Sequence, residues 1–141
     1  MSTVDFLENV VLKNIRPGKL ISNYDRGTIS AGEKEVKLSM QSSYGEDKSD
    51  AKKYMIKFSA CAEVVEEENH DEVFNVKFET NYFFDILNLE KISDITDEHK
   101  TAISAAMVYL DFRSRLQRIL ADVGLSSVKV PLSPINSVTQ E

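Results

Sequence analysis

The hydrophobic period of the sequence changes once, near Thr96. Between residues 35 and 87 there are several stretches in which apolar and polar residues alternate one by one, which is the pattern of half-buried β-strands. After Thr96, apolar residues recur at three- and four-residue steps, which is the pattern of an amphipathic helix. Because the strands form one block and the helix another, the sequence predicts an α+β fold with an antiparallel sheet.

Four strands are expected. The first covers residues 4–15 and ends before the turn sequence Arg16-Pro17-Gly18; the others cover residues 35–41, 54–65 and 73–87, with a polar loop at 42–53. The first strand is apolar on both sides, so we expect a bulge in it or burial of both sides by a partner subunit. The third and fourth strands each present one inward set: Tyr54, Ile56, Phe58, Ala60, Ala62 and Val64, then Phe74, Val76, Phe78, Thr80, Tyr82 and Phe84.

A long helix is expected over residues 97–123, with Thr96 as its N-cap and Gly124 as its stop. Two helices broken near Asp111 would give the same pattern. The predicted inward residues are Ala102, Ile103, Ala106, Met107, Leu110, Phe112, Leu116, Ile119, Leu120 and Val123.

The segment after this helix, residues 125–136, is rich in Leu, Val and Ile. Loops normally run through solvent and are polar. We therefore expect this loop either to cover the core of its own chain or to line a surface on which another apolar chain lies.

Composition bounds the class of protein. With 141 residues, 42% of them hydrophobic and 28% charged, the chain is expected to form one domain over residues 1–141. The net charge of −6 argues against nucleic-acid binding, and Arg113, Arg115 and Arg118 alternate with acids as on a solvated helix face. No signal peptide and no apolar run of the ~20 residues that span a bilayer are visible. We expect a cytoplasmic protein without membrane insertion.

No set of residues specifies catalysis. The single cysteine, Cys61, lies in a strand pattern and is expected to be a buried, inert thiol. Neither His70 nor His99 has the neighbours of a nucleophilic site. The acidic turn at residues 66–72 lacks the ligand spacing of a calcium loop, so a solvated hairpin tip is favoured. We expect no enzyme activity, no metal and no cofactor.

Taken in order, the segments resemble the SecB family of protein-export chaperones. The resemblance rests on Glu35-Val36-Lys37-Leu38, on residues 54–62, on residues 73–86 with Phe83-Phe84, and on Pro134-Ile135-Asn136 after the helix. It implies a four-stranded antiparallel sheet with the long helix on one face and a homotetramer built as a dimer of dimers. It also implies an apolar groove that holds unfolded or non-native polypeptides.

In that family the groove is built from the crossover after the first strand, the second strand and the loop after the long helix. The matching residues here, predicted as client-binding, are Leu20, Ile21, Tyr24, Val36, Leu38, Met40, Val128, Val130, Leu132 and Ile135. Each of them alone would also be explained as core, and the crossover and loop residues are the better candidates.

The chain departs from the family where export chaperones present acidic residues to the translocation motor. Asn14, Gly18 and Lys77 stand at those positions, so binding to a motor is expected to be weak. By the same resemblance, we expect the family's second helix to be reduced to residues 137–141 and its zinc-binding tail to be missing. Holding clients is thus better supported than protein transport, and chaperones paired with toxin–antitoxin systems are candidates.

Two function classes therefore remain open beside a dedicated adaptor for one folded partner. The first is an ATP-independent holdase. The second is a small-ligand-binding or enzymatic α+β domain that uses the same apolar cavity. An enclosed pocket with convergent polar groups would favour the ligand class, and an open groove would favour the holdase.

Overall fold

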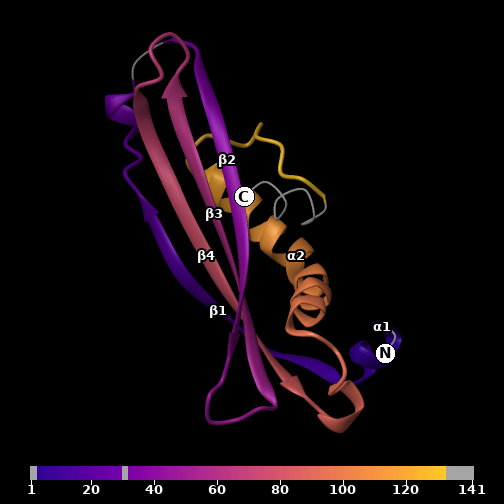
Figure 1. Cartoon of the computed structure of the whole chain (residues 1–141). Coiled ribbons are helices and arrows are strands. Elements are labelled where there is room, and N and C mark those ends of the chain that lie inside the picture. The colour runs from indigo at the N-terminus through magenta and orange to yellow at the C-terminus, as the bar shows by residue number, and fades with distance from the viewer. Residues whose placement is uncertain (1–2, 30–31, 133–141) are drawn as a thin grey trace.

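The computed structural model describes residues 3–29 and 32–132 and contains one antiparallel sheet (Figure 1). Its strands are β1 (Val10–Ser22), β2 (Lys34–Glu46), β3 (Lys53–Glu66) and β4 (Glu72–Ile86), in the order β1-β4-β3-β2. The helices are α1 (Thr3–Glu8) and α2 (Asp97–Asp122), with 3-10 turns η1 (Arg26–Thr28) and η2 (Glu90–Ile92). Helix α2 packs on one face, against β2, β3 and β4. We call this the inner face, and the opposite one the outer face. The predicted fold class is confirmed.

The alternation in β3 and β4 determines which side chains meet α2. All twelve residues that were predicted to point inward from these two strands are buried. Phe58 lies at the centre of the core, stacked on Phe112 of α2 at 5.1 Å between ring centroids and tilted against Tyr109 at 5.7 Å. The core therefore sits between the sheet and α2, and the outer face stays open.

The expected first strand, residues 4–15, is wrong at both ends. Residues 3–8 form α1, and β1 continues through Pro17 and Gly18 to Ser22. β1 pairs only with β4, and an edge strand tolerates a residue without a backbone N–H. Gly18 is needed here because a Cβ at that position would lie 2.9 Å from Cβ of Glu79.

The predicted bulge in the first strand is confirmed, and β1 contains a second bulge beyond the predicted range. The pairing with β4 shifts between Leu12 and Asn14 and again between Pro17 and Leu20. Each bulge adds one residue and reverses which side chains point inward. This explains why the apolar residues of the segment do not keep one parity.

The second strand is longer than predicted. β2 runs on to Glu46, so the expected polar loop at 42–53 shrinks to the turn at residues 47–52. The Asp47 carboxylate accepts hydrogen bonds from the backbone and side chain of Ser49, which satisfies the turn locally. The charged turn between β3 and β4 was predicted correctly, and His70 adopts φ 60° in it.

Helix α2 has the predicted bounds to within one residue, and Thr96 accepts the backbone N–H of His99 as its cap. Phe112, Leu116 and Leu120 are buried as expected. In the first half the prediction is wrong: Ala102, Ala106, Met107 and Leu110 are exposed, whereas the residues that face the sheet are Ser104, Ala105, Val108 and Tyr109. Ser104 and Tyr109 can be buried because both find hydrogen-bond partners, to Tyr54 and to Pro131.

Candidate functional site

The crossover between β1 and β2 is anchored near the start of β4. It leads the chain from one edge of the sheet to the other (Figure 1). The side-chain oxygen of Asn23 accepts the backbone N–H of Asn75 at 2.8 Å, and the Ser22 hydroxyl donates to the Asn75 carbonyl at 2.9 Å. Two residues later the Tyr24 ring meets the buried Phe74 ring edge-on, with 5.0 Å between centroids. These contacts place Tyr24 on the inner face.

Helix α2 ends in a left-handed turn that reverses the chain. Gly124 has φ +79°, a conformation that glycine adopts without the penalty of a Cβ. The backbone N–H of Leu125 then donates to the carbonyl of Leu120 at 2.7 Å. Leu125 consequently packs on the core immediately after the helix.

Two side chains of α2 hold the returning loop. Arg113 Nε donates to the carbonyl of Val130 at 3.1 Å, and the Tyr109 hydroxyl donates to the carbonyl of Pro131 at 2.6 Å. The same hydroxyl lies 4.0 Å from Sδ of Met40 on β2. The loop therefore runs back beside α2 on the β2 side of the inner face. Arg113 has a structural role that the expectation of a solvated helix face did not include.

Crossover, β2, the end of α2 and the returning loop meet in one half-buried apolar surface. Its members pack on two buried clusters, one around Phe58 and one formed by Val64, Phe74 and Val76. Val36, Ile119 and Leu125 touch both clusters and so join the two parts. We call this the apolar surface, and it consists of Tyr24, Ile29, Val36, Leu38, Ile119, Val123, Leu125 and Val128.

The structure brings four of the ten predicted client-binding residues into this surface: Tyr24, Val36, Leu38 and Val128. Met40 and Val130 belong to the core beneath it, with 6% and 4% exposed. Leu132 continues the returning loop and is 74% exposed. Ile135 lies outside the described residues.

The two predicted β1 residues are separated from each other. Leu20 pairs with Phe78 and points to the inner side at the free edge of the sheet, where 59% of it is exposed. Ile21 pairs with Lys77 and points to the outer face, so it lies apart from Tyr24 and Val36. The second β1 bulge sets this parity, and the sequence pattern did not locate it.

Four members of the apolar surface were not predicted as site residues: Ile29, Ile119, Val123 and Leu125. Ile119 and Val123 were assigned to the helix core, and their i, i+4 spacing does put them on one side of α2. Leu125 could have been found, because an apolar residue after a C-terminal glycine usually packs back on the last helical turn.

Polar contacts link α2 to β3 and β4 on the inner face. The Tyr82 hydroxyl and Arg115 Nε both donate to Oδ2 of Asp111 at 2.7 Å. Burial alone would raise the pKa of Asp111, but the hydrogen bonds from Arg115 and Tyr82 outweigh it and hold this pKa below its usual range. Burial raises the pKa of Tyr54, which shares a hydrogen bond with Ser104, to about 12. These groups orient α2 on the sheet.

The outer face carries the residues at which the chain departs from the export chaperones. Asn14 and Lys77 point outward from β1 and β4, and Gly18 lies over Glu79. Cys61 also points outward and is half-buried, where a buried thiol was expected, and burial raises the pKa of this thiol.

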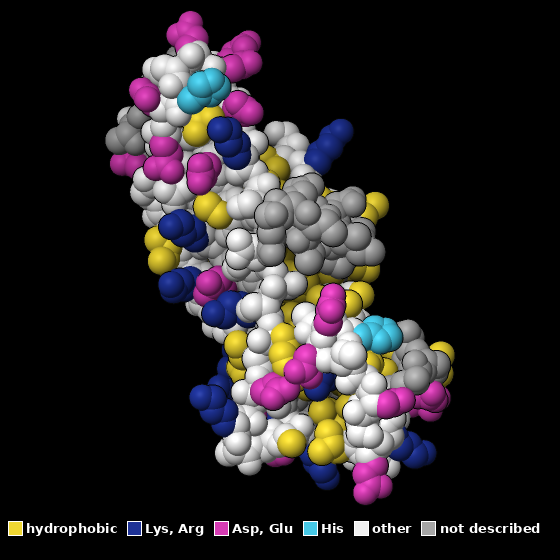
Figure 2. All heavy atoms as spheres, viewed as in Figure 1, with side chains coloured by type: hydrophobic (Ala, Val, Ile, Leu, Met, Phe, Trp, Pro, Cys, Tyr) yellow, Lys and Arg dark blue, Asp and Glu magenta, His cyan; other side chains and the backbone are white. Residues whose placement is uncertain are grey.

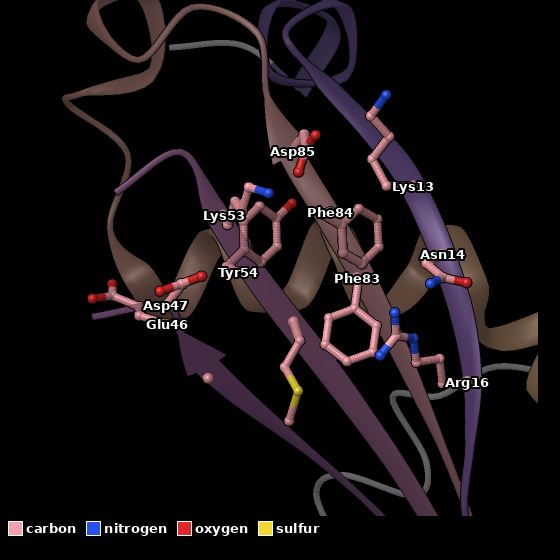
Figure 3. A pocket seen from close by; sticks show the side chains of 12 residues that line it. Lys13, Asn14, Arg16, Glu46, Asp47, Lys53, Tyr54, Phe83, Phe84 and Asp85 are labelled. Atoms are coloured by element: carbon pink, nitrogen blue, oxygen red, sulfur yellow. The ribbon is translucent and has the colours of Figure 1, made fainter. Parts of the chain in front are cut away.

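Two hollows lie on the outer face. One of about 640 Å³ is lined by Asn14, Arg16, Gly45, Met55 and Phe83 among others (Figure 3). Another of about 400 Å³ includes Lys19, Cys61, Lys77 and Glu79. A third, of about 390 Å³, lies between Gly32 and the acidic hairpin tip. None of the three is lined by a predicted client-binding residue.

The fold has a counterpart among solved structures. The structure of Mycobacterium tuberculosis Rv1957, a SecB-like chaperone in complex with a ChAD peptide from the Rv1956 HigA1 antitoxin, matches with a TM-score of 0.65. The match covers 92% of this chain and 94% of that one at 14% sequence identity. No protein-family model and no curated protein matches the sequence significantly. The chain therefore has a SecB-like fold. Within the described part of the chain, no helix is both long and apolar enough to span a bilayer.

Proposed function

We propose that this protein is an ATP-independent holdase that binds unfolded or non-native polypeptides on the apolar surface. The observation that carries the proposal is the convergence of three separate segments, the crossover, β2 and the returning loop, on one half-exposed apolar area. A partly exposed apolar area of this kind suits a partner whose own apolar side chains need cover. The fold similarity to a SecB-like chaperone solved with a peptide supports it.

The chemistry of the apolar surface suits a client without a fixed sequence. It is built from Tyr, Val, Leu and Ile side chains around the Phe74 and Phe58 clusters. Apolar contact contributes about 25 cal/mol per Å² and is not directional, so many chains can use it. Since this term does not depend on charge, client retention is expected to persist in high salt. The alternative of an enclosed ligand site has no support from the three hollows described above.

Client retention is tested by removing side chains from the surface without opening the core. Tyr24→Ser combined with Leu132→Ser removes one half-buried ring and one exposed leucine. We expect retention of a denatured test protein to weaken by roughly tenfold or more, because each buried apolar side chain contributes about 1.5–3 kcal/mol. Suppression of aggregation and the Kd for a labelled unfolded client measure it.

A matched control separates client binding from folding. Tyr44→Ser combined with Leu87→Ser makes the same chemical change at one half-buried tyrosine and one exposed leucine outside the apolar surface. We expect it to retain clients. If the first double variant unfolds, or if both variants lose clients equally, Tyr24 and Leu132 do not form the binding site.

We further propose that the chain assembles with copies of itself, as a dimer of dimers. Leu110 is 64% and Met107 40% exposed on the outward side of α2, and Val4 and Leu7 of α1 are exposed as well. Apolar side chains presented side by side on a helix mark an interface. Light scattering at micromolar protein is expected to give the mass of a tetramer. A monomeric mass that is stable on dilution would contradict this.

A further inference from the structure

The outer face of the sheet carries an excess of positive charge on an acidic protein. Charge over the whole sequence is −6, from 17 basic and 23 acidic residues. β1 nevertheless contains Lys13, Arg16 and Lys19 and no acidic residue. In Figure 2 acidic side chains and a histidine cover the β3–β4 hairpin, Lys and Arg side chains lie along the flank of the sheet, and further acidic side chains lie at the opposite end of the molecule.

Strand pairing orders the outer side chains into rows across the sheet. One row holds Gly45, Met55, Phe83 and Asn14, and the next holds Ser43, Lys57, Asn81 and Arg16. The third holds Gln41, Ser59 and Glu79, and the fourth holds Ser39, Cys61, Lys77 and Ile21. Successive rows are therefore apolar, cationic, polar with one carboxylate, and cationic again.

The cations in these rows are available to a partner. In the described part of the chain, neither the ion pair Lys100–Asp97 nor the ion pair Arg115–Asp111 involves a cation of these rows. Arg16 lies over the Phe83 ring at 5.5 Å from the centroid, which orients its guanidinium without neutralising it. Lys77 is exposed, and Lys19 lines the same hollow. A surface of this sign attracts an acidic partner.

The first row supplies an apolar recess next to the charges. Phe83 stands in the hollow of about 640 Å³ with Arg16 and Asn14 beside it (Figure 3). The other charged residues that line this hollow are Lys13, Lys53, Glu46, Asp47 and Asp85. Gly45 leaves the β2 side of this recess without a side chain, although a Cβ there would make only ordinary contact with Met55, at 3.5 Å. Glycine is thus not required by the backbone, and its effect is to keep the recess open.

We propose that the outer face docks an extended acidic segment of a partner protein. Alternate side chains of an extended chain are ~6.6–7 Å apart, which is the separation of successive rows. The segment that fits presents, at successive alternate positions, an apolar residue to Phe83, an acid to Lys57 and Arg16, an uncharged residue to Glu79, and an acid to Lys77 and Lys19. This docking face is distinct from the apolar surface on the inner side.

A polypeptide fits this face better than a nucleic acid does. A nucleic-acid backbone carries a phosphate at every nucleotide, and Glu79 lies between the two cationic rows, where it would repel the intervening charges. Single-strand binding also relies on several exposed aromatic rings, whereas Phe83 supplies the one ring in these rows.

The proposal is tested with a labelled peptide of about nine residues that carries the apolar, acid, neutral, acid pattern at alternate positions. A permuted peptide of the same composition places one acid opposite Glu79. We expect the patterned peptide to bind more tightly than the permuted one, and we expect its affinity to fall as the salt concentration rises. Equal affinity of the two peptides would overturn the register.

Protein variants locate the site. The double variant Lys57→Glu, Lys77→Glu is expected to bind the peptide roughly tenfold more weakly or worse, since two attractive contacts become repulsive. Lys91→Glu with Lys129→Glu makes the same charge change at exposed positions outside the sheet and is expected to have little effect. An equal loss of peptide affinity in the two double variants would mean that only the net charge of the protein matters, and would overturn the proposal. Gly45→Val, which fills the recess, is expected to lower the affinity for the peptide while the protein stays folded.

Two additional measurements distinguish the docking face from a nucleic-acid site and from the apolar surface. An oligo-dT of similar length that binds more tightly than the patterned peptide would assign the face to nucleic acid and overturn the proposal. The Tyr24→Ser, Leu132→Ser double variant is expected to bind the peptide with unchanged affinity and to bind unfolded clients more weakly. Loss of the peptide in that variant alone would make the peptide another client of the apolar surface. Failure of one proposal is therefore visible separately from failure of the other.

Discussion

The two faces of the sheet use the same alternating strands for opposite purposes. On the inner face Tyr54, Ile56 and Phe58 of β3 are buried beneath α2 and the returning loop. On the outer face their neighbours Met55, Lys57 and Ser59 are only half-buried, and no helix packs over them in the described part of the chain. The inner face is ordered by apolar contact and hydrogen bonds that hold its cover in place. The outer face is ordered by the rows of charge that strand pairing creates.

This difference separates stability from recognition. A side chain between sheet and helix cannot be changed without disturbing many contacts, so the inner face can bind a partner only at its margins, where Tyr24, Val36 and Val128 are half-exposed. The outer face has little packing to lose. Its charges can change without loss of fold, and binding there is expected to respond to salt and to charge reversal.

The largest expected effect comes from the centre of the inner face. Phe58→Ala removes a ring that stacks on Phe112 and contacts Tyr82 and Tyr109. We expect the free energy of unfolding to fall by about 3–5 kcal/mol, because the transfer energy of the ring is lost and a cavity remains. Urea unfolding measures it.

Ser59→Ala is the control, because it is the next residue of β3 and points to the outer face. Its effect is expected to stay within about 0.5 kcal/mol. Similar losses at the two positions would show that both faces are packed, for example because a further copy of the chain covers the outer face.

The sequence predicted these faces well where a strand lies between two others. β3 and β4 are each paired on both sides and alternate as far as a register shift between Val64 and Val65, so all twelve inward assignments were correct. It failed at β1, an edge strand whose two bulges reverse the parity and move Ile21 to the outer face. It also failed for the first half of α2, where Ser104 and Tyr109 face inward because of partners far away in the sequence.

The candidate site was predictable in part for the same reason. Val36 and Leu38 follow from a local period, and Val128 follows from an apolar loop that needs cover. Burial of Met40 and Val130 depends on how closely the returning loop packs, which Arg113 and Tyr109 decide. Residues this distant in sequence leave no pattern that a single chain reveals. The rows of the outer face likewise required the strand register.

A smaller effect is expected at the hydrogen bonds that hold the returning loop. Tyr109→Phe removes the hydroxyl that donates to the Pro131 carbonyl at 2.6 Å. The free energy of unfolding is expected to fall by about 0.5–1.5 kcal/mol. Trypsin cleavage after Lys129 is expected to become faster, because the loop opens more often.

Tyr54→Phe is the matched control for the loop. It removes a buried tyrosine hydroxyl that shares a hydrogen bond with Ser104 of α2 at 2.7 Å but does not touch the loop. Its cost in stability is expected to be similar, with cleavage after Lys129 less affected. If both variants accelerate cleavage equally, the loop opens only with the whole core, and the inner face has no separately mobile margin.

The smallest expected effect concerns the Arg115–Asp111 ion pair within α2, which contrasts with the open cations of the outer face. Hydrogen bonds from Arg115 and Tyr82 outweigh burial and hold the pKa of Asp111 below its usual range. A carboxylate whose pKa is lower in the folded state stabilises the fold above its unfolded pKa of about 3.9, and this contribution is lost as the pH falls further. Asp111→Asn is therefore expected to cost stability at about pH 7 and less at about pH 3.

The cost should be only a few tenths of a kcal/mol, since the side chain is 41% exposed and water screens the pair. Urea unfolding of the wild-type protein and the variant at the two pH values measures how far the difference in their free energies of unfolding decreases. A cost that does not change with pH would assign it to the geometry of the hydrogen bond to Tyr82 and not to the charge.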